Sequence, residues 1–204
     1  MDRLTEAEIA EAKRRLAETE SLYHPDPSLF DPLFETGELR RFSRQEVIMT
    51  PGTMLRDVYI IIDGLVGATY ISGSKIRMHG FAMPGTMLIH GGSFFRTSEP
   101  MMQWEALVPT RAVRVPDSFI RSYMESSHEF AIWMFGMSEN NMMLAEERAM
   151  ILADSAEKQY LKLARIVPLE IFMQLSSRLI ARYLGITEQS LSRIRRTLLE
   201  TGQL

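Results

Sequence analysis

The residues with the clearest chemical role lie in the last thirty positions of this 204-residue chain. Guanidinium groups, hydroxyl groups, an amide and a carboxylate alternate there with apolar residues. Such polar side chains bond the phosphates of a nucleic-acid duplex and the edges of its bases. The polar set comprises Ser177, Arg178, Thr187, Glu188, Gln189, Ser190, Ser192, Arg193 and Arg196. We therefore expect this segment to bind double-stranded DNA.

The spacing of the remaining residues in this segment predicts a helix-turn-helix. Two helices that cross steeply need a small side chain where they touch, and Ala181 stands at that position. Gly185, four residues later, tolerates the positive φ that the turn requires. Ser176 and Thr187 are suited to cap the two helices. We expect the small core to be closed by Ile180, Leu184, Ile186, Leu191, Ile194 and Leu198.

The second helix of such a motif places its N-terminal residues at base edges in the major groove. Arg193 can bond guanine O6 and N7, Gln189 suits adenine, and Glu188 can accept from the cytosine amino group. Ser192 and Arg196 fall on the same face. The residues better placed for phosphates are Ser177, Arg178, Thr187 and Ser190.

The charge distribution is consistent with this prediction. The segment 176–204 contains five arginines and two glutamates, so its net charge is +3. The net charge of the rest of the chain is therefore −6. A basic end on an acidic body suits a module that meets a polyanion with one end only. A solvated helix face would also carry such charge, so charge alone does not decide.

Upstream, from Leu39 to Pro116, the chain consists of short β-like runs broken by glycine and proline. Asp63-Gly64 between two β-branched runs is a strong hairpin signal. No helices alternate with the runs, which favours an antiparallel jelly roll over a parallel sheet. The expected strands are Leu39–Phe42, Glu46–Met49, Val58–Asp63, Leu65–Ile71, Lys75–Met83, Met87–His90, Met102–Val108 and Ala112–Val115.

Helices are expected before and after the roll, at Thr5–Thr19, Asp117–Met124, Ser127–Leu152 and Ser155–Ile166. The third of these would be about 38 Å long at 1.5 Å per residue. Because it outreaches a small roll, we expect part of its face to meet a second copy of the chain. The residues assigned to that dimer interface are Phe130, Met134, Met137, Asn141 and Leu144.

The predicted organisation is an α+β chain in three parts. Residues 1–125 form an N-terminal helix and a cyclic-nucleotide-binding-like roll, 126–153 the dimerisation helix, and 154–204 the DNA-binding domain. The segment from Ile166 to Phe172 is too short for a strand-turn-strand before the helix-turn-helix.

This order of elements resembles the Crp/Fnr family of bacterial regulators, over nearly the whole chain. The most specific segments are Ile180–Thr187 and Leu191–Arg195, which are similar to the Crp-like branch common in Bacteroidetes, and Ala156–Leu161 also fits. The resemblance implies a homodimer that reads a two-fold symmetric site under the control of an effector-binding roll. It places base reading on Glu188, Gln189 and Arg193, and makes RNA polymerase a further candidate partner.

The resemblance does not carry over the family's effectors. Members that bind cyclic nucleotides hold the phosphate with a glutamate and an Arg-Ser pair, and counting on from Gly85 these positions are His90, Pro100 and Met101. We therefore do not expect cAMP, because a cyclic phosphate needs an arginine or an amide nest. Arg96 could substitute only if its loop rearranged.

The sequence bears differently on each of the other effectors. The chain has no cysteine, which excludes a thiolate-held iron–sulfur cluster. Haem would need a methionine or a histidine such as His79 or His90, although the four histidines have no ligand spacing. An apolar ligand remains an alternative to a side-chain-filled roll. The candidate pocket consists of Met87, Ile89, His90, Met101, Met102 and Trp104.

Two other classes of function compete with DNA binding. No nucleophile with a base, paired carboxylates, metal cluster or phosphate loop is visible in the sequence, so we expect neither an enzyme nor a metal site. The alternative is an effector-binding or interaction protein whose helix-turn-helix no longer reads DNA. The lack of cysteine, of a secretory signal and of a membrane-spanning run leads us to expect a cytoplasmic protein that contacts no membrane.

Overall fold

The computed structural model describes residues 3–19, 23–52, 57–73, 75–89, 94, 101–152 and 154–202. Two compact units divide the chain. Unit 1 comprises Met1–Ala68 and Phe81–Leu144, and unit 2 comprises Thr69–Gly80 and Ala145–Leu204. Each unit is therefore built from two separate stretches of chain, and the boundary falls inside the long helix.

The described strands form two four-stranded sheets, with the orders β1-β8-β3-β6 and β2-β7-β4-β5. Described pairs such as β1 with β8 and β3 with β8 are antiparallel, which confirms the antiparallel roll. The glycine of the predicted Asp63-Gly64 turn has φ 93°, as a tight turn requires. The strands are β1 (Glu38–Phe42), β2 (Val47–Met49), β3 (Val58–Asp63), β4 (Val66–Ser72), β5 (Lys75–Ala82), β6 (Met87–Leu88), β7 (Gln103–Ala106) and β8 (Thr110–Val115).

The helices follow the sequence-based expectation closely. Three described elements were not expected: α7, and η1 and α2, which lie in the proline-punctuated stretch. Pro27 and Pro32 occupy the first turns of η1 and α2, where a missing N–H costs nothing. The described helices are α1 (Glu6–Ala17), η1 (Pro27–Phe30), α2 (Asp31–Thr36), α4 (Asp117–Ser126), α5 (His128–Leu152), α6 (Ala156–Ile166), α7 (Leu169–Phe172), α8 (Ser177–Leu184) and α9 (Glu188–Glu200).

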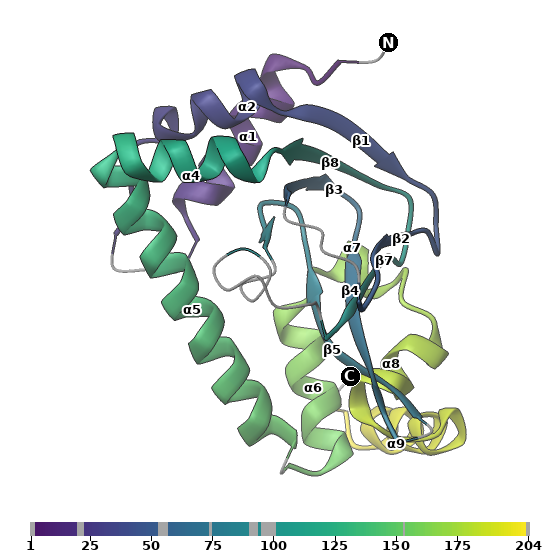
Figure 1. Cartoon of the computed structure of the whole chain (residues 1–204). Helices are drawn as coiled ribbons and strands as arrows, with labels where there is room; N and C mark the ends of the chain where they lie inside the picture. Colours follow the sequence, from purple (N-terminus) through teal and green to yellow (C-terminus); the bar gives the residue numbers. More distant parts are fainter. Residues whose placement is uncertain are drawn as a thin grey trace. The chain divides into compact units, whose positions relative to one another are not determined.

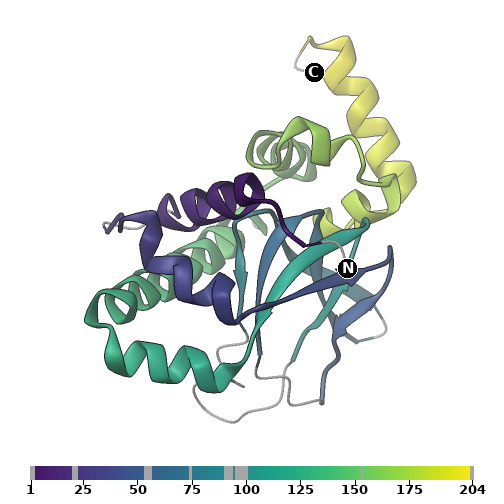
Figure 2. The same ribbon diagram turned by 90° about the horizontal axis from the view of Figure 1, so that it is seen from above.

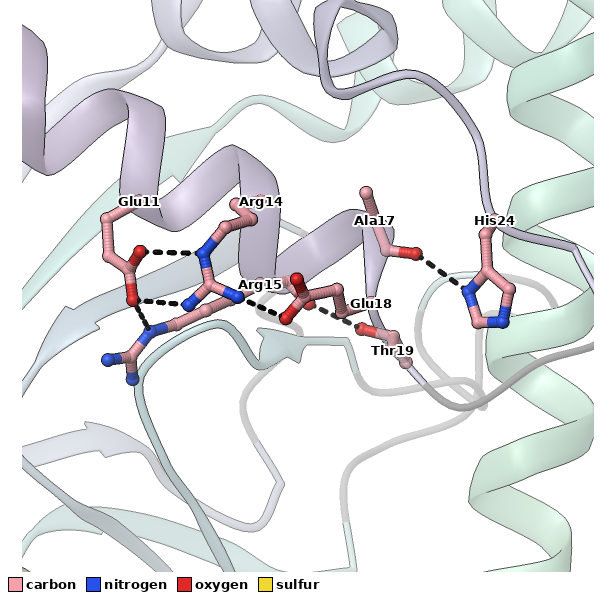
Figure 3. Close-up of polar contacts among 7 residues, drawn as sticks. All are labelled: Glu11, Arg14, Arg15, Ala17, Glu18, Thr19 and His24. Carbon is pink, nitrogen blue, oxygen red and sulfur yellow. Dashed lines mark hydrogen bonds and ion pairs between the residues drawn. The ribbon is translucent and has the colours of Figure 1, made fainter.

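Helix α1 begins at a capping box. The amide of Glu8 donates to Thr5 Oγ1 at 3.2 Å, and the amide of Thr5 donates to Glu8 Oε2 at 2.8 Å. Further along, Glu11 pairs with Arg14 and Arg15, and this network lowers the pKa of Glu11 to about 2 (Figure 3). These pairs lie on the surface and contribute little to stability.

The core of unit 1 joins the roll to the helices on its flank. Figures 1 and 2 show α1, α2 and α4 gathered around the N-terminal part of α5. Phe30 and Trp133 meet edge to face at a centroid distance of 4.8 Å, and the indole N–H of Trp133 donates to the Leu16 carbonyl. The buried members of this core include Leu16, Phe30, Leu33, Val58, Ile60, Met87, Val113, Ile120, Phe130, Trp133, Met134 and Met137.

This core corrects the expected dimer interface. Phe130, Met134 and Met137 have exposed fractions of 0%, 1% and 5% and pack inside unit 1, so they offer no surface to a partner. The stripe read from the sequence is the core-facing stripe of α5. Asn141 and Leu144 are exposed.

Candidate nucleic-acid interface

The helix-turn-helix of unit 2 forms from α8, a short turn and α9. The Ser176 hydroxyl accepts from the Leu179 amide at 3.2 Å, and the Thr187 hydroxyl accepts from the Ser190 amide at 3.1 Å. Both predicted N-caps are therefore confirmed. Between the helices, Gly185 adopts the left-handed conformation with φ 70°, as the turn requires.

A small apolar core holds the two helices together. Ala181 is buried at the crossing, as expected from its size. Helix α6 closes this core from another side, because Tyr160 and Leu163 are buried and α6 packs on α8. The buried residues of α8 and α9 are Ile180, Ala181, Tyr183, Leu184, Leu191 and Leu198, whereas Ile186 and Ile194 are half-buried.

The predicted base-reading residues share one exposed surface. They lie on α9 at spacings of one, three and four, which places them along one side of a helix. Those that are exposed are Glu188, Gln189, Ser192, Arg193 and Arg196.

The predicted phosphate-binding residues lie at the starts of the two helices. Arg178 and Thr187 are exposed, whereas Ser177 and Ser190 are half-buried. Three of these side chains have partners within the protein, since the Ser190 and Thr187 hydroxyls lie 3.0 Å apart within the cap of α9 and Ser177 Oγ accepts from Arg195.

The arginines of this surface carry uncompensated charge. Within the described residues, no carboxylate forms an ion pair with Arg178, Arg193 or Arg196, whereas Arg14, Arg111 and Arg114 of unit 1 all have such pairs. An unpaired guanidinium in water is available to a phosphate or a guanine edge without first breaking an internal ion pair. The surface is therefore a suitable binding site for a polyanion.

Arg195 has a different role from its neighbours on α9. Its Nε donates to the Tyr160 hydroxyl at 3.2 Å and its Nη1 donates to Ser177 Oγ at 2.9 Å. The guanidinium thereby links α9 to α6 and α8. In the sequence, an arginine beside two others gives no sign of such an internal partner.

The described residues proposed as an effector pocket belong to different parts of the core. Met87 is buried in the core of unit 1 and Ile89 packs against that core. Trp104 packs instead against a second cluster around Tyr59 and Ile61. Met101 is 81% exposed, Met102 is half-buried, and His90, like Arg96 and Pro100, lies outside the described residues.

The Trp104 indole Nε1 is buried and has no hydrogen-bond partner among the described residues. No group of three or more metal-ligating side chains occurs in the described ranges. Nor does any described helix combine the length and the apolar character needed to cross a bilayer.

These elements, an antiparallel roll, a long helix and a C-terminal helix-turn-helix, form a fold that is shared with solved structures, one of which is described as a regulator of the Crp/Fnr family. The chain matches no protein-family model, and no curated protein matches it in sequence. Solved structures nevertheless share its fold.

FixK2 from Bradyrhizobium japonicum is 19% identical with a TM-score of 0.70, over 81% of this chain and 86% of that one. CLP, a c-di-GMP responsive global regulator of Xanthomonas campestris, is 13% identical with a TM-score of 0.66, over 87% and 93%. A Crp/Fnr family transcriptional regulator from Eubacterium rectale is 13% identical with a TM-score of 0.68, over 87% and 85%.

Proposed function

We propose that this protein is a sequence-specific DNA-binding transcription regulator of the Crp/Fnr type. The observation that carries the proposal is the exposed face of α9, where Gln189, Arg193 and Arg196 project from a capped helix-turn-helix. Arginine and glutamine on the first turns of a recognition helix are the side chains best suited to base edges in the major groove. The fold shared with known regulators supports the same function.

We propose further that the protein acts as a homodimer through α5. The solvent-facing side of this helix carries large apolar residues that a folded monomer would leave in water. Burying them against a second copy would place two recognition helices on a two-fold symmetric operator. The exposed apolar residues of α5 are Ile132, Phe135, Met142, Met143, Leu144 and Met150. Leu144, with the exposed Asn141, retains the place in the interface that its sequence position indicated.

The regulator we propose has no cAMP-dependent step. The positions expected to hold a cyclic phosphate are occupied by His90, Pro100 and Met101, none of which supplies a guanidinium. Structural neighbours differ in what they respond to, since CLP responds to c-di-GMP and a solved CprK structure contains OCPA. Fold alone therefore assigns no effector to the roll.

The proposal is tested by selecting binding sites from a random duplex pool with the purified full chain at physiological salt. We expect enrichment of a palindrome with half-sites about one helical turn apart. The pool is selected in parallel with and without cell extract, so that a requirement for an effector is detected. No enrichment in either arm would favour an interaction protein whose helix-turn-helix does not read DNA.

A further inference from the structure

Two arginines from outside the helix-turn-helix bind the C-terminal end of α8. Arg148 of α5 donates from Nη2 to the carbonyl of Tyr183, and Arg77 of β5 donates from Nη1 to the carbonyl of Gly185 at 3.3 Å. All four residues belong to unit 2. The last carbonyls of a helix lack intrahelical donors and form the negative end of its dipole, so cations are stabilising there.

The surroundings of Arg148 are unusual for a guanidinium. Its Cζ lies 3.7 Å from the centre of the Tyr183 ring, and burial lowers its pKa. No carboxylate pairs with it among the described residues, and its Nη1 is buried without a hydrogen-bond partner in the same part of the chain. Burying a charge without a counter-ion is unfavourable. A residue of this kind contributes a defined geometry more than it contributes stability.

Arg77 approaches the turn closely because residue 185 is a glycine. A Cβ at that position would lie 2.6 Å from Arg77 Nη1, which is shorter than any normal contact. The same glycine supplies the left-handed conformation that lets the chain leave α8 and enter α9. Arg77 therefore binds the segment that sets the angle between the two helices.

We propose that Arg148 and Arg77 are positioning residues for DNA recognition, which hold the Tyr183–Gly185 end of α8 and so fix the orientation of α9. This inference rests on the proposed function and extends it to residues that touch no DNA themselves. Without the two donors, α9 keeps its basic surface but no longer has a single orientation. Contacts to phosphates tolerate such freedom, whereas hydrogen bonds to base edges do not.

The test compares Arg148→Met, Arg77→Met and the double variant with Arg165→Met, which removes one exposed positive charge from α6 of the same unit. Arg148→Lys keeps the charge and one donor. Affinity is measured for the selected operator and for random duplex over a range of salt concentrations. Amide hydrogen exchange is measured at Gly185 and Ile186, whose N–H groups bond to carbonyls of α8.

We expect Arg148→Met to lower operator affinity at least about tenfold, the loss typical of a hydrogen bond to a charged group, while random-duplex affinity and salt slope match those of Arg165→Met. Exchange at Gly185 and Ile186 should accelerate, and Arg148→Lys should recover part of both effects. Should Arg148→Met fail to fold, Arg77→Met and Arg148→Lys provide the same comparison.

Equal operator-to-random ratios and equal exchange rates in all variants would overturn the inference. The exchange measurement needs no DNA, so it separates this inference from the proposed function. A parent chain without operator preference would contradict the function, and accelerated exchange in Arg148→Met would still establish the role of the arginines in holding the turn.

Discussion

Arg195 and Ser177 are joined by a hydrogen bond of 2.9 Å from the guanidinium Nη1 to the hydroxyl Oγ. This bond connects the middle of the recognition helix with the first residue of α8. Since the Ser177 oxygen accepts from a cation, its own O–H is left to donate outward. Ser177, which we expect to contact a phosphate, is thus held by Arg195, a residue outside the predicted DNA-binding set.

Replacing Arg195 with Met should weaken binding to operator and random duplex by a similar factor of about 3–10, because a charged hydrogen bond that orients a phosphate donor is lost. Electrophoretic mobility shift with both duplexes measures the two affinities. Ser177→Ala should have a similar effect, and the double variant should lose little more. Additive losses would show that the two residues act separately.

Arg193 and Arg178 should differ in the kind of binding they support. Arg193→Ala should cost about 1–3 kcal/mol on the operator and relax preference at one base position of each half-site. Arg178→Ala should weaken all duplexes alike and reduce the salt slope by about one per protomer. Titration at several salt concentrations distinguishes the two patterns. Identical behaviour of both variants would remove Arg193 from the base-reading set.

The exposed apolar side of α5 provides a test of dimerisation. Phe135 and Met142 are 72% and 61% exposed, so introducing aspartate at both positions should leave the monomer folded and disrupt an interface built on them. Sedimentation velocity should show a monomer for the double variant. Met173, 75% exposed on the surface of unit 2, provides the matched control through Met173→Asp. A parent chain that sediments as a monomer would contradict the proposed dimer.

His79 should make stability depend on pH. Burial, and secondarily the charge of Arg148, lower the pKa of His79 below its ordinary value of 6.5. The unfolded chain therefore takes up a proton that the folded chain resists, so stability is complete above about pH 6.5 and falls as the pH decreases below that value. Glu8 and Glu11, whose ordinary value is 4.5, act only at lower pH.

Thermal unfolding at pH 7.5 and 5.5 measures this contribution. The melting temperature should fall less in His79→Gln than in the parent, and His128→Gln, at an exposed position, should behave like the parent. An equal fall in the parent and in His79→Gln would show that other groups account for the pH dependence.

Alanine substitutions at Gly185 and Gly73 compare the loss of stability at a crowded turn with that at an open turn. Both have positive φ, 70° and 61°, but a Cβ at Gly73 would meet nothing within 4 Å, whereas at Gly185 it would collide with Arg77. Gly73→Ala should destabilise by about 1 kcal/mol, the usual cost of a left-handed alanine. Gly185→Ala should destabilise by about 2 kcal/mol, because the end of the Arg77 side chain must also shift and its hydrogen bond to the Gly185 carbonyl is lost. Urea denaturation provides both values, and equal costs would mean that Arg77 moves aside freely.

The sequence predicted most of the local structure and little of the long-range pairing. Alternating patterns and Asp63-Gly64 located the strands, and Ser176, Gly185 and Thr187 located the helix-turn-helix, because caps and turns depend on nearby residues. The stripe containing Phe130 and Met134 was visible, but periodicity does not reveal whether a stripe meets its own core or another chain. Likewise, nothing near Arg148 or Arg195 in the sequence indicates a partner 35 residues away.

Unit 2 is assembled from two stretches of chain, and the bond from Arg77 to Gly185 joins residues 108 positions apart. During synthesis, the hairpin segment of this unit therefore leaves the ribosome long before the helices that it binds. We therefore expect the helices of unit 2 to reach their final form only after the strand that carries Arg77 has formed, since they need contacts with it. A fragment beginning at Ala145 would lack Arg77 and His79, so the DNA-binding helices should be studied in the full chain.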